Sequence, residues 1–141
     1  MMRYPISGLC CMLVFLFGPM ASAQSGELEL FSLSDPSGAT LQWFVSEKRL
    51  CSTKPWSPET QAPPLTPTQA VQAAIKARAP KKQWIVTGIS ISAAGCGGEF
   101  RWYYGVDMYD SGDIAAGNPP DSVKQVVLMD GSILAPRPPK R

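Results

Sequence analysis

The chain has 141 residues, with 13 Lys+Arg against 11 Asp+Glu and no histidine. This length suits one domain, and 45% apolar with 17% charged residues are typical of a globular protein. The lack of histidine excludes Ser-His-Asp and Cys-His catalysis, histidine-ligated zinc or haem, and an imidazole pH switch. A net charge of +2 leaves no electrostatic footprint for nucleic acid, so no nucleic-acid partner is expected.

Residues 1–23 have the organisation of a secretory signal peptide. Arg3 supplies the positive end, an apolar stretch follows from Ile6 to Phe17, and residues 21–23 form a small-x-small cleavage site. The apolar stretch is shorter than the ~20 residues that span a bilayer, so we expect cleavage and no stable membrane insertion. The mature protein would begin at Gln24 and be exported, into the periplasm if the source is a Gram-negative bacterium and otherwise as a secreted protein.

Two strands are expected at the start of the mature chain. Residues 27–31 and 41–45 alternate polar and apolar side chains, and a turn signal at residues 35–38 lies between them. Residues 24–53 would therefore form an N-terminal hairpin. The prolines of residues 54–66 exclude a helix interior and a central strand, so this segment is expected to be an extended linker.

Cys51 and Cys96 are the two cysteines that remain after cleavage of the leader. Export to an oxidising compartment and an even count favour a structural disulfide between them. Closing a loop of this length contributes roughly 4 kcal/mol in the chain-entropy model. The alternative is a reactive thiol, but the sequence has no CxxC motif and no histidine or basic cluster to lower a thiol pKa.

Residues 67–135 are expected to form a helix followed by three strands. The helix begins with a capping box made by Thr66 and Gln69, and it ends before Pro80. Its apolar face is narrow and rich in alanine. We expect Ile75, in the middle of that face, to be buried against the strands.

Three antiparallel strands are predicted over residues 83–92, 100–108 and 123–129, with a short return at residues 132–134. In the middle strand, Trp102 and the other even-numbered residues would face the helix and be buried. The first strand is expected to carry three isoleucines on one face: Ile85, Ile89 and Ile91.

This order of elements predicts an α+β fold, with one helix packed on a curled antiparallel sheet and an N-terminal hairpin pinned by the disulfide. Residues 24–136 would form this single domain. Residues 137–141 are basic and rich in proline, and they are expected to form a solvated tail.

The helix Thr68–Ala79, the strand Trp102–Asp107 and the closing segment Val127–Leu134 carry a resemblance to a known family. Together they resemble the helix-plus-three-strand unit of PepSY-like domains, small exported modules related in shape to cystatins. The resemblance covers Thr66–Ala135, and the adjacent Asp130-Gly131 departs from the family's Asp–x–Gly turn. It implies a non-catalytic binding or peptidase-inhibiting module.

The segment between the second and third strands is rich in aspartate, with Asp107, Asp110, Asp113 and Asp121. Clustered carboxylates can hold Ca²⁺, and Asp107, Asp110 and Asp113 are the candidates. Their spacing does not match an EF-hand loop, so a solvated, turn-rich loop is favoured and no metal is expected.

Arg101, Tyr103, Asp107 and Tyr109 would lie on the side of the middle strand that faces away from the helix. Exposed aromatic side chains beside charges suit contact with a protein partner. In the alternative, the N-terminal hairpin or another strand covers these residues as a second core layer. The sequence does not decide between the two.

We therefore expect a small exported, non-catalytic binding or interaction module, with a protein partner, no cofactor and a peptidase-inhibitor-like role if the resemblance carries function. One alternative is an accessory component of a cell-envelope assembly that acts through a sheet edge or surface contacts. The other is a carboxylate- or metal-dependent enzyme at the Asp107–Asp121 loop.

Overall fold

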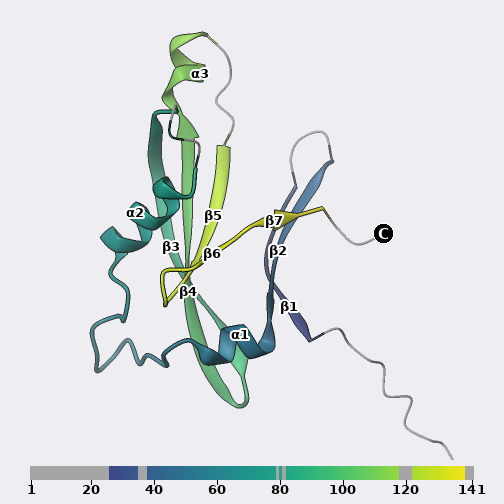
Figure 1. Cartoon of the computed structure of the whole chain (residues 1–141), viewed down its shortest axis with the longest axis vertical. Coiled ribbons are helices and arrows are strands. Elements are labelled where there is room, and N and C mark those ends of the chain that lie inside the picture. Colours follow the sequence, from purple (N-terminus) through teal and green to yellow (C-terminus); the bar gives the residue numbers. More distant parts are fainter. Residues whose placement is uncertain (1–25, 35–37, 79, 81, 118–121, 139–141) are drawn as a thin grey trace, which may run out of the picture.

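The computed structural model describes residues 26–138 except 35–37, 79, 81 and 118–121 (Figure 1). The expected signal peptide, most of the hairpin turn, Asp121 and the last three residues lie outside the described residues. Within them the chain is mixed α+β, with two antiparallel sheets and three helices. The predicted fold class is confirmed, but a single curled sheet under one helix is not, because the strands divide between two sheets.

The first sheet contains the predicted N-terminal hairpin, formed by β1 (Glu27–Ser34) and β2 (Thr40–Ser46). Its third strand, β7 (Pro136–Arg137), comes from the end of the described chain and pairs with β2. Arg137 is exposed, as expected for a solvated tail, but it belongs to this strand. Its backbone pairs with the otherwise open edge of β2, and its guanidinium lies 2.8 Å from the carboxylate of Glu27.

Helix α1 (Glu47–Ser52) follows β2 directly and was not predicted. The hydroxyl of Ser46 caps it by accepting a hydrogen bond from the Arg49 backbone N–H. Leu50 is fully buried and anchors this short helix in the core between the sheets. The helix is too short to be stable alone, so its position depends on that contact and on the disulfide.

Helix α2 (Pro67–Lys76) begins with the predicted capping box, in which Thr66 and Gln69 satisfy each other's backbone N–H groups. Its buried residues are Ala70 and Ala74. These lie four positions apart on one stripe, and their small side chains let the helix backbone approach the sheet closely. The expectation that Ile75 is buried is wrong: it is 39% exposed, because it lies off that stripe.

The second sheet has the strand order β3-β4-β5-β6. Its strands are β3 (Trp84–Cys96), β4 (Glu99–Asp110), β5 (Ser122–Leu128) and β6 (Ile133–Leu134). They fall where the sequence predicts them, with β3 reaching four residues further than expected. Helix α3 (Ser111–Ala115) lies in the segment predicted to be a loop.

A register shift between Val86 and Gly88 interrupts the pairing of β3 with β4. Such a bulge inserts an extra residue and reverses which face the following side chains occupy. Ile85 therefore lies on the opposite face of the sheet from Ile89 and Ile91. The expectation that all three isoleucines share one face is wrong.

The second sheet is covered on both faces (Figure 1). On one face, the two buried alanines of α2 pack with Tyr104, Val106 and Met108. On the other, Trp43 and Val45 of the first sheet pack with Tyr103. The sheet is therefore the middle of three layers. No helix in the part of the chain that the structure describes is long and apolar enough to cross a membrane.

Candidate functional site

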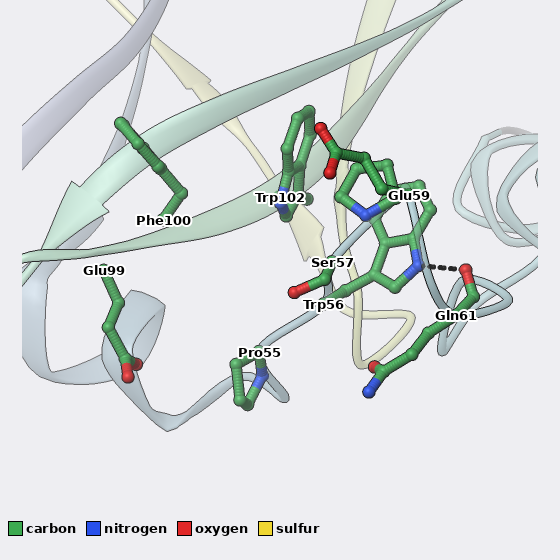
Figure 2. A pocket seen from close by; sticks show the side chains of 9 residues that line it. Pro55, Trp56, Ser57, Glu59, Gln61, Glu99, Phe100 and Trp102 are labelled. Atoms are coloured by element: carbon green, nitrogen blue, oxygen red, sulfur yellow. Dashed lines mark hydrogen bonds between the residues drawn. The ribbon is translucent and has the colours of Figure 1, made fainter.

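An open groove of about 750 Å³ lies beside the turn between β3 and β4 (Figure 2). One wall is the linker segment 55–61, and the other is the start of β4 at residues 99–102. These two segments are far apart in the sequence. The groove therefore exists only because the fold brings the linker across the end of the second sheet.

The linker wall is held in shape by its own hydrogen bonds. The carbonyl of Ser57 accepts from the backbone N–H groups of Thr60 and Gln61, both at 3.1 Å. The indole N–H of Trp56 donates to the carbonyl of Gln61 at 2.8 Å, which fixes the ring against the turn (Figure 2). Prolines at positions 55 and 58 further limit the backbone, so this wall is preorganised.

The β4 wall presents two aromatic side chains, Phe100 and Trp102, from the same face of the strand. Trp102 is half-buried and packs edge-on against Trp56, with ring centroids 5.4 Å apart and an interplanar angle of 69°. Phe100 is 66% exposed, the most exposed large apolar side chain among the described residues. Helix α2 covers the strand further along, at Tyr104 and beyond, and leaves Phe100 open.

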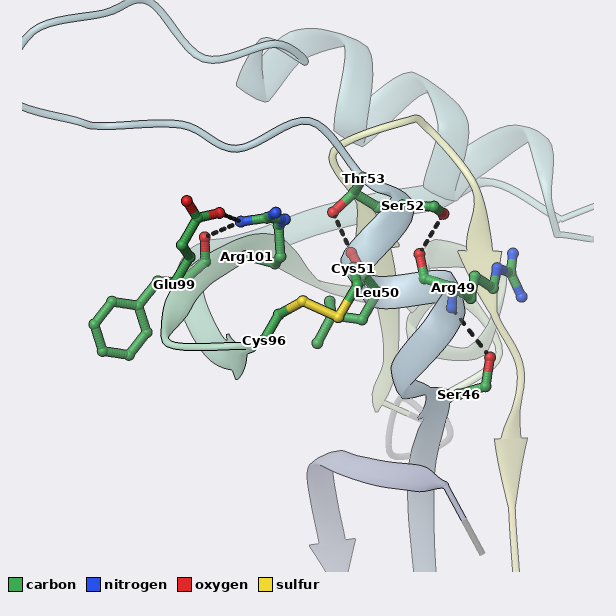
Figure 3. The surroundings of a disulfide bond; sticks show 10 residues. Ser46, Arg49, Leu50, Cys51, Ser52, Thr53, Cys96, Glu99 and Arg101 are labelled. Carbon is green, nitrogen blue, oxygen red and sulfur yellow. Dashed lines mark hydrogen bonds and ion pairs between the residues drawn. A yellow bond between two sulfur atoms is a disulfide. The ribbon is translucent and has the colours of Figure 1, made fainter.

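The disulfide between Cys51 and Cys96 holds the two walls together (Figure 3). Cys51 lies in α1, just before the linker, and Cys96 ends β3 directly opposite Glu99. Their Cα atoms are 5.6 Å apart. At the end of α1, the backbone N–H and the hydroxyl of Thr53 both donate to the carbonyl of Leu50, which sets the direction in which the linker leaves the helix. The predicted bond is confirmed, and it joins the hairpin to the second sheet.

Two carboxylates line the groove. Glu99 forms an ion pair with Arg101 at 2.8 Å, and the guanidinium also donates to the Phe100 carbonyl (Figure 3). Glu59 is exposed and has no ion-pair partner within the ranges that the structure describes. The groove thus combines aromatic walls with the carboxylate of Glu59, which no ion pair neutralises among the described residues.

The residues proposed from the sequence as a partner-binding surface lie on one face of β4, but that face is covered. Arg101 and Tyr103 are only 8% and 7% exposed. The hydroxyl of Tyr103 donates to the Leu30 carbonyl of β1 at 2.8 Å, and burial raises the pKa of this hydroxyl. Tyr103 therefore belongs to a second core layer that the N-terminal hairpin covers, as in the alternative, whereas Arg101 is buried with its guanidinium against Glu99 and the Phe100 carbonyl.

Asp107 and Tyr109, the other two members of that set, are partly exposed. The carboxylate of Asp107 is already paired with the ammonium of Lys124 at 2.8 Å. That ammonium also lies 4.6 Å from the ring centroid of Phe31 in β1. Asp107 therefore holds the Lys124 ammonium, and it is Lys124 that contacts the first sheet.

Two of the three aspartates proposed as a weak cation site, Asp107 and Asp110, have other partners in the structure. Asp110 caps α3 by accepting a hydrogen bond from the Gly112 backbone N–H at 3.0 Å, and its carboxylate lies 3.3 Å from Lys82. The hydrogen bond from Gly112, helped by Lys82, lowers the pKa of Asp110. Asp113 stands in the first turn of α3. Among the described residues, no three acidic or cysteine side chains are grouped to hold a metal ion.

The sequence patterns do not predict the groove, because the alternation in residues 100–108 indicates buried aromatic side chains and the prolines of residues 54–66 indicate an extended linker. One signal was present: Trp56 is a large apolar residue inside a Pro-rich segment, where it needs a partner elsewhere in the chain. In comparisons with family models, curated proteins and solved structures, nothing matches the chain.

Proposed function

We propose that the protein is a small exported, non-catalytic binding module that holds an extended segment of a protein partner in the groove. The observation that carries this proposal is the exposed ring of Phe100 beside the Trp56–Trp102 pair, on walls joined by a disulfide. Exposed aromatic rings on a preorganised surface bind a ligand at a low cost in conformational entropy.

The lining favours a peptide that contains proline and basic residues. Aromatic grooves bind Pro-rich segments, because an extended proline helix packs its rings between aromatic side chains. Arginine or lysine in the same peptide would pair with Glu59 and stack on the indole of Trp56 or Trp102. The groove is open along its length, which suits an extended chain.

Export is part of the same proposal. Residues 1–23 have the pattern of a cleaved leader, and the Cys51–Cys96 bond suits a compartment that is not reducing. The chain resembles PepSY-like and cystatin-like domains, in which a helix crosses a curled sheet. This resemblance supports a more specific version of the proposal, in which the bound segment belongs to a peptidase.

The proposal is tested by titrating the exported chain with a synthetic peptide of about ten residues that alternates proline with arginine, followed by tryptophan fluorescence. We expect saturable binding, at least about tenfold weaker in Phe100→Ala. Because Phe100 is largely exposed, this variant keeps its fold. Ile114→Ala, an equally conservative change at an exposed position in α3, serves as the matched control and binds normally.

A second peptide with glutamate in place of arginine tests the charge argument and should bind more weakly. Equal binding of both peptides would overturn the role of Glu59. Equal affinity of the wild type and Phe100→Ala would show that the groove is not the binding site.

A further inference from the structure

The outermost strand of the second sheet, β3, is unusual for a sheet edge. It has 13 residues and pairs only with β4. Between Trp84 and Cys96 it contains no charged residue and no proline. Edge strands are normally protected from pairing with other chains by charges, prolines, bulges or a covering segment. The bulge at Val86–Gly88 lies near one end, so Gly88–Cys96 pairs with β4 without interruption.

The outer backbone groups of β3 have no partner strand among the described residues. Outside its ladder with β4, the nearest backbone hydrogen bond runs from Ser111 to Gln83, before the strand begins. Ile89 and Ile91 are 43% and 41% exposed. Both face the layer of α2, so they form a small apolar patch beside the open edge.

We propose that β3 pairs antiparallel with β3 of a second copy of this chain, around a two-fold axis at Ser90. The four-stranded sheets of the two copies then form one continuous sheet. Ile89 of each copy lies opposite Ile91 of the partner subunit, which closes the two apolar patches against each other. Such a contact uses the same surface on both copies, as two-fold dimers do.

Charge favours a second copy as the occupant. The strand itself carries no charge, so two copies do not repel each other along it. At the Trp84 end, Lys82 is paired with Asp110, and at the Cys96 end, Glu99 is paired with Arg101. An antiparallel arrangement places Arg78 of each copy beside the Glu99–Arg101 pair of the other, so no two unpaired like charges meet between the described residues of the two strands. This inference is independent of the groove and goes beyond the proposed function.

The test is sedimentation velocity on the exported chain between about 1 and about 100 μM, with two double variants. Ile89→Lys/Ile91→Lys places lysine opposite lysine across the axis, and we expect dimerisation to weaken by at least about a hundredfold. Ile89→Lys/Ile91→Glu places lysine opposite glutamate and should recover at least about tenfold of that loss. Both positions are partly exposed, so both variants fold, which circular dichroism verifies. Ile114→Lys is the control and dimerises as the wild type does.

Deuterium uptake gives an independent measurement. In the wild type, the amides of Trp84–Cys96 should exchange more slowly at high than at low protein concentration, while β1 amides do not change. Three outcomes would overturn the proposal: a wild type that stays monomeric throughout the range, a lysine–lysine variant that still dimerises, or a β3 whose exchange is independent of concentration. A lysine–glutamate variant no better than the lysine–lysine variant would overturn the register at Ser90.

Discussion

Removing the Cys51–Cys96 bond tests how the first sheet, the linker and the groove depend on one another. The cysteines are 45 residues apart in the sequence. For a closed loop of that length, the chain-entropy relation corresponds to about 4 kcal/mol at 25 °C. Cys51→Ser/Cys96→Ser should lose about this much of the free energy of unfolding. The double substitution leaves no free thiol to form dimers between chains.

The measurement is urea unfolding of the wild type and the double variant, followed by tryptophan fluorescence. Since the bond restrains the unfolded chain, its removal should also raise the dependence of the free energy on urea, because a larger surface is exposed on unfolding. The peptide affinity should fall as well, because α1 no longer holds the linker beside Glu99. A loss below about 1 kcal/mol with unchanged peptide affinity would refute the reasoning, and would mean that Leu50 alone positions α1.

Three further predictions concern the core and the titrating groups. Ala74→Leu should lower the free energy of unfolding in urea by about 1–3 kcal/mol, because Ala74 is fully buried and leaves no space for a larger side chain between α2 and the sheet. Ile75→Ala should lower it much less, because Ile75 is partly exposed. Equal losses in the two variants would contradict the packing described. Tyr103→Phe should lose about 1 kcal/mol with the hydrogen bond to Leu30. Burial raises the pKa of Tyr103, so the neutral hydroxyl stabilises the fold below pH ~10, and this stabilisation is lost as the pH rises further. The free energy of unfolding of the phenylalanine variant should therefore fall less in alkali than that of the wild type. Asp110 has a lowered pKa, so its ionised carboxylate stabilises the fold above pH ~4, and this stabilisation is lost as the pH falls. In Asp110→Asn, the free energy of unfolding should therefore decrease less steeply as the pH is lowered. An acid limb unchanged in that variant would show that other carboxylates control it.

The features that could be predicted from the sequence are those that depend on neighbouring residues or on the number of cysteines. The capping box of Thr66 and Gln69 is a local interaction within one turn, and it forms as the spacing predicts. The alternation in β1, β2 and β4 depends on the same short range. The pairing of Cys51 with Cys96 needed only an even count and an oxidising compartment.

The features that could not be predicted depend on which segment covers which face. Tyr103 and Tyr104 are neighbours that point to opposite faces, and both are buried, because each face has its own covering layer. A pattern in one strand cannot show that a hairpin 70 residues earlier covers its second face. In α2, the small volume of Ala70 and Ala74 decided the buried face, against the greater hydrophobicity of Ile75.

The candidate site was missed for the same reason. Phe100 belongs to the apolar alternation of β4, which indicates burial, but α2 is too short to cover that end of the strand. The linker that forms the opposite wall has no periodic pattern, and its path to Trp102 depends on its attachment to Cys51 and on the hydrogen bonds of Thr53. Both facts involve residues that are distant in the sequence.

The pairing of β7 with β2 has a consequence for the order of folding. The Glu27–Arg137 contact joins residues 110 positions apart, so the first sheet is completed only when these two distant segments meet. Contacts of such long range form slowly, because a large loop must close first. The helix and the second sheet contain mainly closer contacts and can assemble earlier. Until Pro136 and Arg137 pair with β2, that edge of β2 therefore stays open to other strands.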